Sequence, residues 1–361
     1  MPELFKPRSE STGADSKRRQ ESIFLRACRR EQVDRTPVWL MRQAGRYQPE
    51  FREIRAKTTF LELCKNTELA CEVTVLAVKQ LQVDAAIIFA DILLLLEPLG
   101  VGLEYAKGEG PIIHRPVKSM EDVKALRPVV AREDLAYVMN AISLTRAELP
   151  ADIPLIGFAG APFTIAAYMI EGGSSRNFDK TKSFMYNQPQ AWSILMKTIC
   201  GITSDYLNAQ IEAGAEAVQL FDSWVGNLSP HDYAQYVAPY SKLIIDSIVG
   251  DIPVIHFGTG TTTLLPQMTE AGGDVIGVDW RTDLDSAWRT IGYDRSIQGN
   301  LDPCVLLGNK DEIKEQAERV LREAAGRPGH IFNLGHGVLP PTNPDNVRYL
   351  VDLVHNYGVK Q

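Results

Sequence analysis

The feature that most restricts the fold of this chain is a series of short, continuously apolar runs that recur through its length. Each run is rich in Val, Ile, Leu or Phe, and a longer segment separates it from the next. Apolar character without alternation is typical of strands buried on both faces, as in a parallel sheet. The predicted strands are Pro37–Met41, Ala85–Ala90, Pro154–Phe158, Ala217–Phe221, Pro253–Phe257, Asp274–Val278, Ser296–Gly299 and His330–Leu334.

Amphipathic segments lie between the runs, and several of them end at glycine or begin at proline, as helices do. Strands that alternate with helices over 361 residues predict an α/β fold, a (β/α)8 TIM barrel. A doubly wound open sheet is the alternative, but no G-x-G-x-x-G motif follows the first run. The predicted helices include Phe60–Leu81, Pro189–Ala213, Asp311–Ala325 and Pro344–Tyr357.

No repeat of fixed period and no internal linker divides the chain, so we expect a single catalytic barrel domain over residues 21–361. Residues 1–20 are polar and contain no apolar run, which predicts a disordered tail rather than a secretory signal. The most apolar stretch is interrupted by Asp91 and is shorter than the roughly 20 residues of a membrane helix.

Charge and cysteine content exclude several classes of function. The 38 Lys and Arg residues against 45 Asp and Glu give a net charge of −7, which argues against a general binder of nucleic acid or anionic membranes. Five dispersed cysteines without a C-x-x-C pair predict neither a disulfide framework nor a zinc ribbon. We therefore expect a cytoplasmic protein that acts on a small molecule.

The residues that follow the predicted strands are mostly polar residues or glycine. In a barrel the carboxyl ends of the strands meet at one rim, and the chemistry takes place there. We therefore expect the binding pocket at this rim. The residues expected to line it are Arg42, Asp91, Gly160, Asp222, Ser223, Gly258, Asp279, Asn300 and His336.

Positive charge is concentrated directly after the first predicted strand. Between residues 37 and 57, five Lys or Arg residues face two Glu residues, a local charge of +3. Guanidinium groups bind carboxylates and phosphates through paired hydrogen bonds, so this segment is either a clamp for a polyanion or a solvated helix start. Asp91, in apolar surroundings, is either an acceptor for ligand N–H groups or the cap of the next segment.

Other catalytic arrangements find no support in the sequence. There is no G-x-S-x-G elbow for a Ser-His-Asp triad. There is also no H-E-x-x-H motif and no paired Cys/His ligand set. The sequence therefore gives no support for metal catalysis.

Several motifs together resemble the uroporphyrinogen decarboxylase family of the haem pathway. The most specific is PVWLMRQAGRY, and the others follow in the family's order, from about residue 22 to the C-terminus. The matching segments are Pro37–Tyr47, Ile156–Thr164 with Tyr168 and Glu171–Gly173, Phe221–Ser223, Gln298–Pro303 and Asn333–Gly337.

The resemblance implies a (β/α)8 barrel, a homodimer, and decarboxylation of the four acetate side chains of uroporphyrinogen III to methyl groups. The products are coproporphyrinogen III and CO2, and no cofactor takes part. The general acid stays open among Arg42, Tyr168, His336 and a bound water. The resemblance assigns catalysis to Asp91, Arg42, Tyr168 and His336, and substrate binding to Arg42, Gln43, Ala44, Gly45, Arg46, Arg55, Asp91, Tyr168, Ser223 and His336.

Two other functions stay open. A zinc-dependent corrinoid or thiol methyltransferase of the same barrel superfamily would carry a His-x-Cys motif near the fifth strand, where this chain has His256-Phe257-Gly258. A non-catalytic tetrapyrrole-binding protein would keep the fold and bind without releasing CO2.

Overall fold

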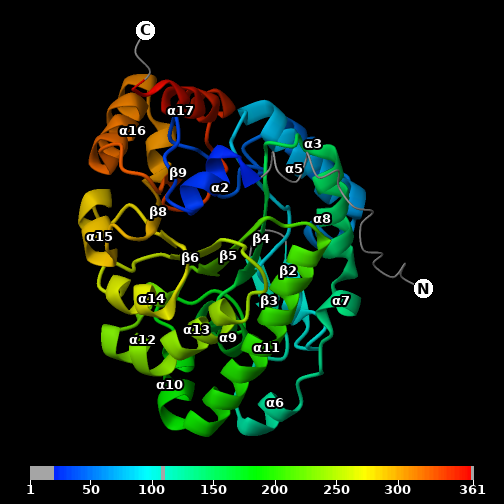
Figure 1. The fold of residues 1–361 in the computed structure, drawn as a ribbon. Helices are drawn as coiled ribbons and strands as arrows, with labels where there is room; N and C mark the ends of the chain where they lie inside the picture. The colour runs from blue at the N-terminus through cyan, green and yellow to red at the C-terminus, as the bar shows by residue number, and fades with distance from the viewer. Residues whose placement is uncertain (1–19, 107–109, 359–361) are drawn as a thin grey trace.

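At the centre of the molecule, seven parallel strands form one curled sheet with helices around it (Figure 1). The computed structural model describes residues 20–106 and 110–358, so the predicted tail at residues 1–20 lies almost wholly outside the described residues. The order of the strands in the sheet is the order of their sequence. They are β1 (Ala86–Ile87), β4 (Leu155–Gly160), β5 (Ala217–Asp222), β6 (Val254–Gly258), β7 (Val275–Gly277), β8 (Ser296–Leu301) and β9 (His330–Leu334).

Helices cover the outside of the sheet, and the strands β4 and β6 to β9 are buried along their whole length. The α-helices are α2 (Ile23–Cys28), α3 (Pro49–Arg55), α4 (Phe60–Lys65), α5 (Thr67–Leu81), α6 (Met120–Lys124), α7 (Ala131–Asp134), α8 (Ala136–Glu148), α9 (Pro162–Glu171), α10 (Asp179–Asn187), α11 (Pro189–Ala213), α12 (Pro230–Tyr236), α13 (Ala238–Asp246), α14 (Leu265–Ala271), α15 (Leu284–Ile291), α16 (Lys310–Ala324) and α17 (Pro344–Asn356). Short 3-10 helices are η1 (Leu94–Leu96), η2 (Val225–Asn227) and η3 (Pro303–Leu307).

The first predicted strand, Pro37–Met41, differs from the other seven, because it touches β9 through a single parallel bridge between Val38 and Phe332. Phe332 donates its N–H to the carbonyl of Pro37 over 2.8 Å. On the other side, the N–H of Asp84 donates to the carbonyl of Val38, while the N–H of Val38 donates to the carboxylate of Asp84, both over 2.8 Å. A side chain therefore takes the place of a strand partner, which keeps this segment from forming a regular ladder.

Two further features differ from the sequence prediction, a helix boundary and an additional sheet. The single helix predicted over Phe60–Leu81 is wrong: the structure has α4 and α5, with Asn66 between them. The side chain of Asn66 accepts the N–H of Leu69 over 2.8 Å and so caps α5, an arrangement that asparagine favours. A second sheet, the antiparallel pair β2 (Leu103–Ala106) and β3 (Gly110–Ile113), was not predicted.

A buried chain of polar side chains links the first segment to strands on the far side of the sheet. The indole N–H of Trp39 donates to Gln298 on β8 over 2.9 Å. The amide of Gln298 donates to Gln219 on β5 over 3.1 Å, and Gln219 lies 3.7 Å from the sulfur of Met41. Because β5 and β8 are separated by two strands, the sheet must curl for these side chains to meet.

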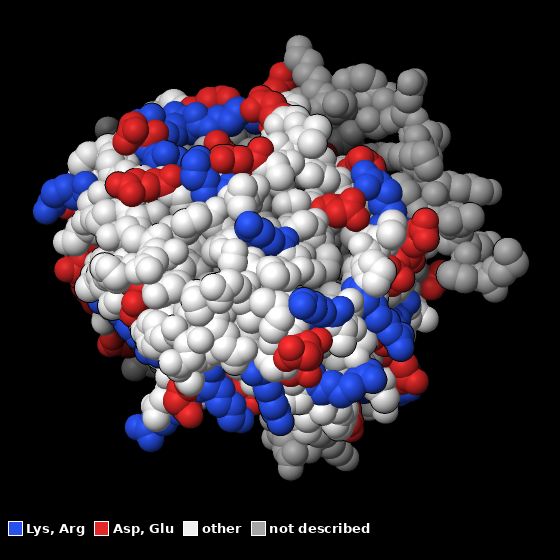
Figure 2. Space-filling view, turned by 90° about the horizontal axis from the view of Figure 1, so that it is seen from below, with Lys and Arg blue, Asp and Glu red and all other residues white. Residues whose placement is uncertain are grey.

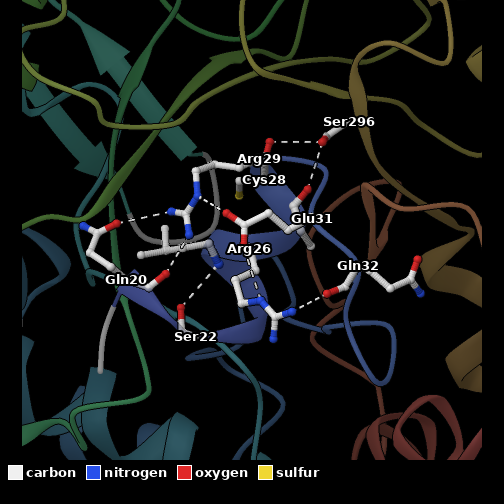
Figure 3. A network of polar contacts seen from close by, with 10 residues as sticks. Gln20, Ser22, Arg26, Cys28, Arg29, Glu31, Gln32 and Ser296 are labelled. Carbon is white, nitrogen blue, oxygen red and sulfur yellow. Dashed lines mark hydrogen bonds and ion pairs between the residues drawn. The ribbon is translucent and has the colours of Figure 1, made fainter. Parts of the chain in front are cut away.

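The helix α2 lies against the amino ends of the strands (Figure 3). Ser296, the first residue of β8, donates its hydroxyl to the carbonyls of Ala27 and Cys28 at the end of α2. Beside it, Glu31 accepts from Arg29 over 2.6 Å and from Arg26 over 3.3 Å. In barrel-like folds this end contributes to stability rather than to chemistry.

On the side of the molecule where α10 and α12 lie, uncharged residues cover much of the surface, a few Lys or Arg side chains lie within this area, and further Lys, Arg, Asp and Glu are mixed around the margin (Figure 2). The neighbouring helices α10 and α11 each carry an exposed apolar side chain, Tyr186 and Ile194. Among the described residues, no helix combines the length and apolar character needed to cross a bilayer.

Candidate active site

The structure gathers four of the predicted catalytic residues at the carboxyl edge of the parallel sheet. Arg42 follows the first segment, Asp91 follows β1, Tyr168 is on α9 after β4, and His336 follows β9. Burial is the largest influence on the pKa of Asp91, of Tyr168 and of His336, and the positive charge of Arg42 acts on all three groups. The three side chains are therefore within electrostatic reach of one guanidinium group.

A tight turn presents Arg42 to this edge. Arg42 has a φ of 61°, in the left-handed region that non-glycine residues rarely adopt, and its side chain is exposed. The turn is held by the buried side chain of Gln43, which accepts the N–H of Leu40 over 3.1 Å and donates to the carbonyl of Ala85 over 3.2 Å. Tyr47 donates its hydroxyl to the carbonyl of Gln43 over 2.7 Å. These hydrogen bonds hold Arg42 in its strained backbone conformation, a feature that is common where a side chain must face a ligand.

The loop after β9 packs directly against the side chain of Arg42. A Cβ atom added to Gly337 would lie 2.6 Å from Cγ of Arg42, closer than real atoms approach. Val338 donates its N–H to the carbonyl of Met41 over 2.9 Å, and Met41 donates its own N–H to Asn333 on β9 over 3.2 Å. Glycine at position 337 therefore makes room for the arginine, and backbone bonds fix the two loops together.

Asp91 is half-buried, and its two carboxylate oxygens have different surroundings. Oδ1 accepts the hydroxyl of Tyr105 over 2.6 Å and the N–H of Leu93 over 2.8 Å. Oδ2 accepts no hydrogen bond from the part of the chain that the structure describes. Burial raises the pKa of Asp91 above its ordinary value, and the hydroxyl of Tyr105 opposes this shift.

Tyr168 is held in place by a stacked indole. Its ring lies 3.8 Å from that of Trp224, with 29° between the planes. The backbone N–H of Trp224 donates to the hydroxyl of Thr164 over 3.3 Å, and that hydroxyl donates to the buried carboxylate of Asp222 over 2.7 Å. Thr164 and Tyr168 are four residues apart on α9 and share one face of that helix. Burial raises the pKa of Tyr168 to about 12, so its hydroxyl keeps its proton at neutral pH.

His336 is neutral at pH 7. Burial, together with the charges of Arg42 and Arg281, lowers its pKa to about 4 against the opposing effect of Asp279. Asp279 is buried and accepts the N–H of Gly260 over 2.7 Å as well as the guanidinium of Arg281. Arg281 also lies over the ring of Trp280, 4.3 Å from its centroid.

The other predicted binding residues have more varied surroundings. Arg46 is exposed, and its guanidinium has no hydrogen bond to a described residue. Arg55 donates to the carbonyl of Thr58 and lies beside Cys64, whose pKa its charge lowers, so it faces α4. The side-chain amide of Gln43 makes its hydrogen bonds to Leu40 and Ala85, which hold the turn. Ala44, Gly45 and Ser223 are half-buried.

Sequence reasoning missed Tyr105, Trp224, Thr164 and Arg281. Trp224 and Thr164 lie inside or next to motifs that were singled out, and the i, i+4 spacing of Thr164 and Tyr168 was a readable signal. Tyr105 belongs to the hairpin that was not predicted, so no pattern pointed to it. Arg281 follows the predicted rim residue Asp279 by two positions.

Within residues 20–106 and 110–358, no three His, Cys, Asp or Glu side chains are grouped so that they could hold a metal ion. His256 is buried in β6, with its Nδ1 3.2 Å from the carbonyl of Gly272.

Comparison with known proteins agrees with this geometry. The chain is 54% identical over 333 residues to uroporphyrinogen decarboxylase of Carboxydothermus hydrogenoformans, covering 92% of this chain and 95% of the relative. It is 50% identical over 338 residues to the enzyme of the same name from Geobacter sulfurreducens, covering 93% and 99%. Among solved structures, a methyltransferase from Methanosarcina mazei has a TM-score of 0.76 at 21% identity, covering 93% of this chain and 98% of that one, a likeness of fold alone.

Residues 19–357 match the family described as "Uroporphyrinogen decarboxylase (URO-D)". Together with identities near 50% over almost the whole chain, this match establishes that this chain belongs to the uroporphyrinogen decarboxylase family.

Proposed function

We propose that this chain removes CO2 from the four acetate side chains of uroporphyrinogen III and releases coproporphyrinogen III. The observation that carries the proposal is the carboxylate of Asp91, whose Oδ2 accepts no hydrogen bond from the described residues and which is within electrostatic reach of Arg42 and Tyr168. The family membership and the relatives of the same name support it.

The chemistry follows from what an acetate on a pyrrole ring requires. Protonation of the adjacent ring carbon makes the ring an electron sink, so the substrate supplies what a cofactor otherwise would. The bond between the acetate methylene and its carboxylate then breaks, CO2 leaves, and the electron pair neutralises the ring. A proton adds to the methylene carbon and the ring carbon loses its own, so each decarboxylation consumes one proton.

Each catalytic residue has a part in this sequence. Free Oδ2 of Asp91 accepts the pyrrole N–H groups and stabilises the cation as it forms. Arg42 and Arg46 bind substrate carboxylates and hold the reacting ring in place, which lowers the entropic cost. Since burial lowers the pKa of His336 to about 4, its imidazole enters the site as a neutral hydrogen-bonding partner for the substrate. The candidate proton donors are Arg42, Tyr168, His336 and a bound water.

The remaining predicted contacts belong to the same proposal. Ser223 and Arg55 bind further polar groups of the substrate. Gln43 shapes the turn through its side chain, and Ala44 and Gly45 line the approach to Arg42 with backbone atoms.

We also propose that the sheet is a closed (β/α)8 barrel and that residues 21–361 form one catalytic domain. The bonds of Val38 to Asp84 on one side and of the 37–39 segment to Phe332 on the other support closure. The polar chain from Trp39 to Gln219 supports it as well. A homodimer and a cytoplasmic location remain predictions from the sequence; the exposed apolar side chains of Tyr186 and Ile194 support the homodimer.

The test is an anaerobic, metal-free incubation with uroporphyrinogen III, followed by oxidation and separation of the products by their number of carboxylates. We expect a series from eight carboxylates down to four. Asp91→Ala is expected to lose about 100-fold or more of the turnover, because it removes the charge that faces the cation. Asp251→Ala, at an exposed position, is the matched control.

A near-normal rate for Asp91→Ala would refute the role of that carboxylate. Unchanged substrate from folded wild-type protein would refute the function and leave the methyltransferase and the non-catalytic binding protein. Stoichiometric zinc by metal analysis would then select the methyltransferase.

A further inference from the structure

The hydroxyl of Tyr105 makes the shortest hydrogen bond that the structure gives to Asp91. It donates to Oδ1 over 2.6 Å, a length typical of an O–H group bound to an ionised carboxylate. The same oxygen accepts the N–H of Leu93, so Oδ1 is satisfied within the protein. The outer oxygen, Oδ2, is left for a ligand.

The framework around Tyr105 fixes its ring. The ring lies 4.8 Å from that of Phe60 on α4, with 58° between the planes. Tyr105 sits on β2, which pairs with β3, and Ile113 at the end of β3 donates its N–H to the carbonyl of Gly172 just after α9 over 2.8 Å. The hydroxyl therefore reaches Asp91 from a hairpin that is bonded to the helix carrying Tyr168.

Five groups that can carry charge face Asp91. They come from five elements and act in different directions. Burial favours the neutral acid, whereas the hydroxyl of Tyr105, the N–H of Leu93 and the charge of Arg42 all lower the pKa of Asp91. The pKa of Tyr105 itself is raised far above its usual range by burial and by Asp91, so the hydroxyl stays a donor. The groups are Arg42, Cys64, Tyr105, Tyr168 and Tyr206.

We infer that Tyr105 is a positioning residue of the active site, whose hydroxyl orients the Asp91 carboxylate with Oδ2 toward the substrate and keeps that carboxylate ionised. The inference rests on the proposed function, because only an anionic carboxylate stabilises a cationic pyrrole. Removal of the Tyr105 hydroxyl takes away one of the three interactions that lower the pKa of the half-buried Asp91 carboxyl and so favour its charged form.

The test compares Tyr105→Phe with Tyr293→Phe. Both variants remove one hydroxyl from a Tyr–Asp hydrogen bond, but Tyr293 donates to Asp285 at an exposed place beyond α15, over 2.9 Å. Phenylalanine keeps the packing on Phe60. In Tyr105→Phe we expect kcat to fall about tenfold with a smaller change in KM. We expect the acidic limb of the pH profile of kcat/KM to move up by about one pH unit, the size of one charge-assisted hydrogen bond. Tyr293→Phe should match the wild type in both.

A measurement without substrate separates this inference from the proposed function. Protein labelled with carboxyl-13C aspartate is titrated by NMR, and the Asp91 signal is assigned by its loss in Asp91→Asn. A higher pKa for Asp91 in Tyr105→Phe supports the inference even if wild-type protein fails to turn over uroporphyrinogen, which would refute only the function. An unshifted Asp91 titration, or an unmoved acidic limb in an active enzyme, overturns the inference.

Discussion

At the scale of single residues, Arg42 shows how a loop position becomes a site. Its left-handed backbone turns the side chain toward the sheet edge, and Gly337 lies under that side chain with no Cβ of its own. The arginine is therefore held by the shape of the neighbouring loop as well as by its own turn. We therefore expect position 337 to influence substrate binding through Arg42.

Replacement of Gly337 by alanine tests this arrangement. The new methyl group would displace Cγ and Cδ of Arg42, so we expect KM for uroporphyrinogen to rise about tenfold, or about 1.4 kcal/mol of lost binding. Steady-state kinetics measure the effect, and the melting temperature should stay close to that of the wild type because the clash is with a flexible side chain.

Two further variants give this prediction its control. Gly335→Ala, on the same loop, would place a methyl group 2.6 Å from the backbone nitrogen of Trp280 and should lower the melting temperature instead. If Gly337 acts through Arg42, then adding Gly337→Ala to Arg42→Ala has no further effect on KM. Independent, multiplicative effects of the two changes would contradict the argument.

At the scale of elements, the helix α11 depends on more than its sequence propensity. It runs unbroken over Pro189–Ala213 as predicted, although Gly201 lies within it. Glycine costs a helix about 0.5–1 kcal/mol relative to alanine, yet one face of α11 is buried along its length, and that packing outweighs the cost.

We therefore expect Gly201→Ala to stabilise the protein by about 0.5–1 kcal/mol. Position 201 is exposed, and an added Cβ would meet no atom within 4 Å. Urea unfolding measures the gain. Gly157→Ala on β4 is the contrasting variant, since its Cβ would lie 2.6 Å from the side-chain oxygen of Gln210, and it should destabilise. A loss of stability in Gly201→Ala would show that α11 has a neighbour there.

At the scale of the whole molecule, burial keeps three histidines neutral. Burial lowers the pKa of His256, His330 and His336 to about 4 each, whereas a histidine in an unfolded chain titrates near 6.5. Between these values the unfolded state binds more protons, so stability falls as the pH falls from about 6.5 to 4. Burial raises the pKa of Asp222 to about 7 and also raises that of Asp91, which acts in the opposite direction, but these are two groups against three.

The free energy of unfolding should thus be lower at pH 4.5 than at pH 6.5, as measured by urea titration at each pH. The slope of the free energy of unfolding against pH reports how many protons the protein takes up when it unfolds. In His330→Asn this uptake should be smaller by about one proton, whatever the effect of the substitution on stability at pH 7. His231→Asn is the control, because the side chain of His231 is 81% exposed. Equal slopes for wild type and His330→Asn would refute the role of this buried histidine.

How much the sequence predicted depends on the range of the interaction concerned. Apolar runs located all seven strands of the parallel sheet, and polar residues after them located Arg42, Asp91 and His336, because both signals are local. The break at Asn66 and the irregular first segment at Val38 were missed, since capping and the bond to Asp84 compete with periodicity.

The sequence by itself therefore determined the order of strands and helices and the chemical types at the edge of the sheet. Its family motifs determined the family. The tertiary structure alone decided which partners those residues have: Tyr105 on Asp91, Trp224 on Tyr168, Gly337 beneath Arg42. The physical reason is that these contacts join segments 14 to 295 positions apart, and their geometry arises only when the sheet curls and brings its loops to one edge.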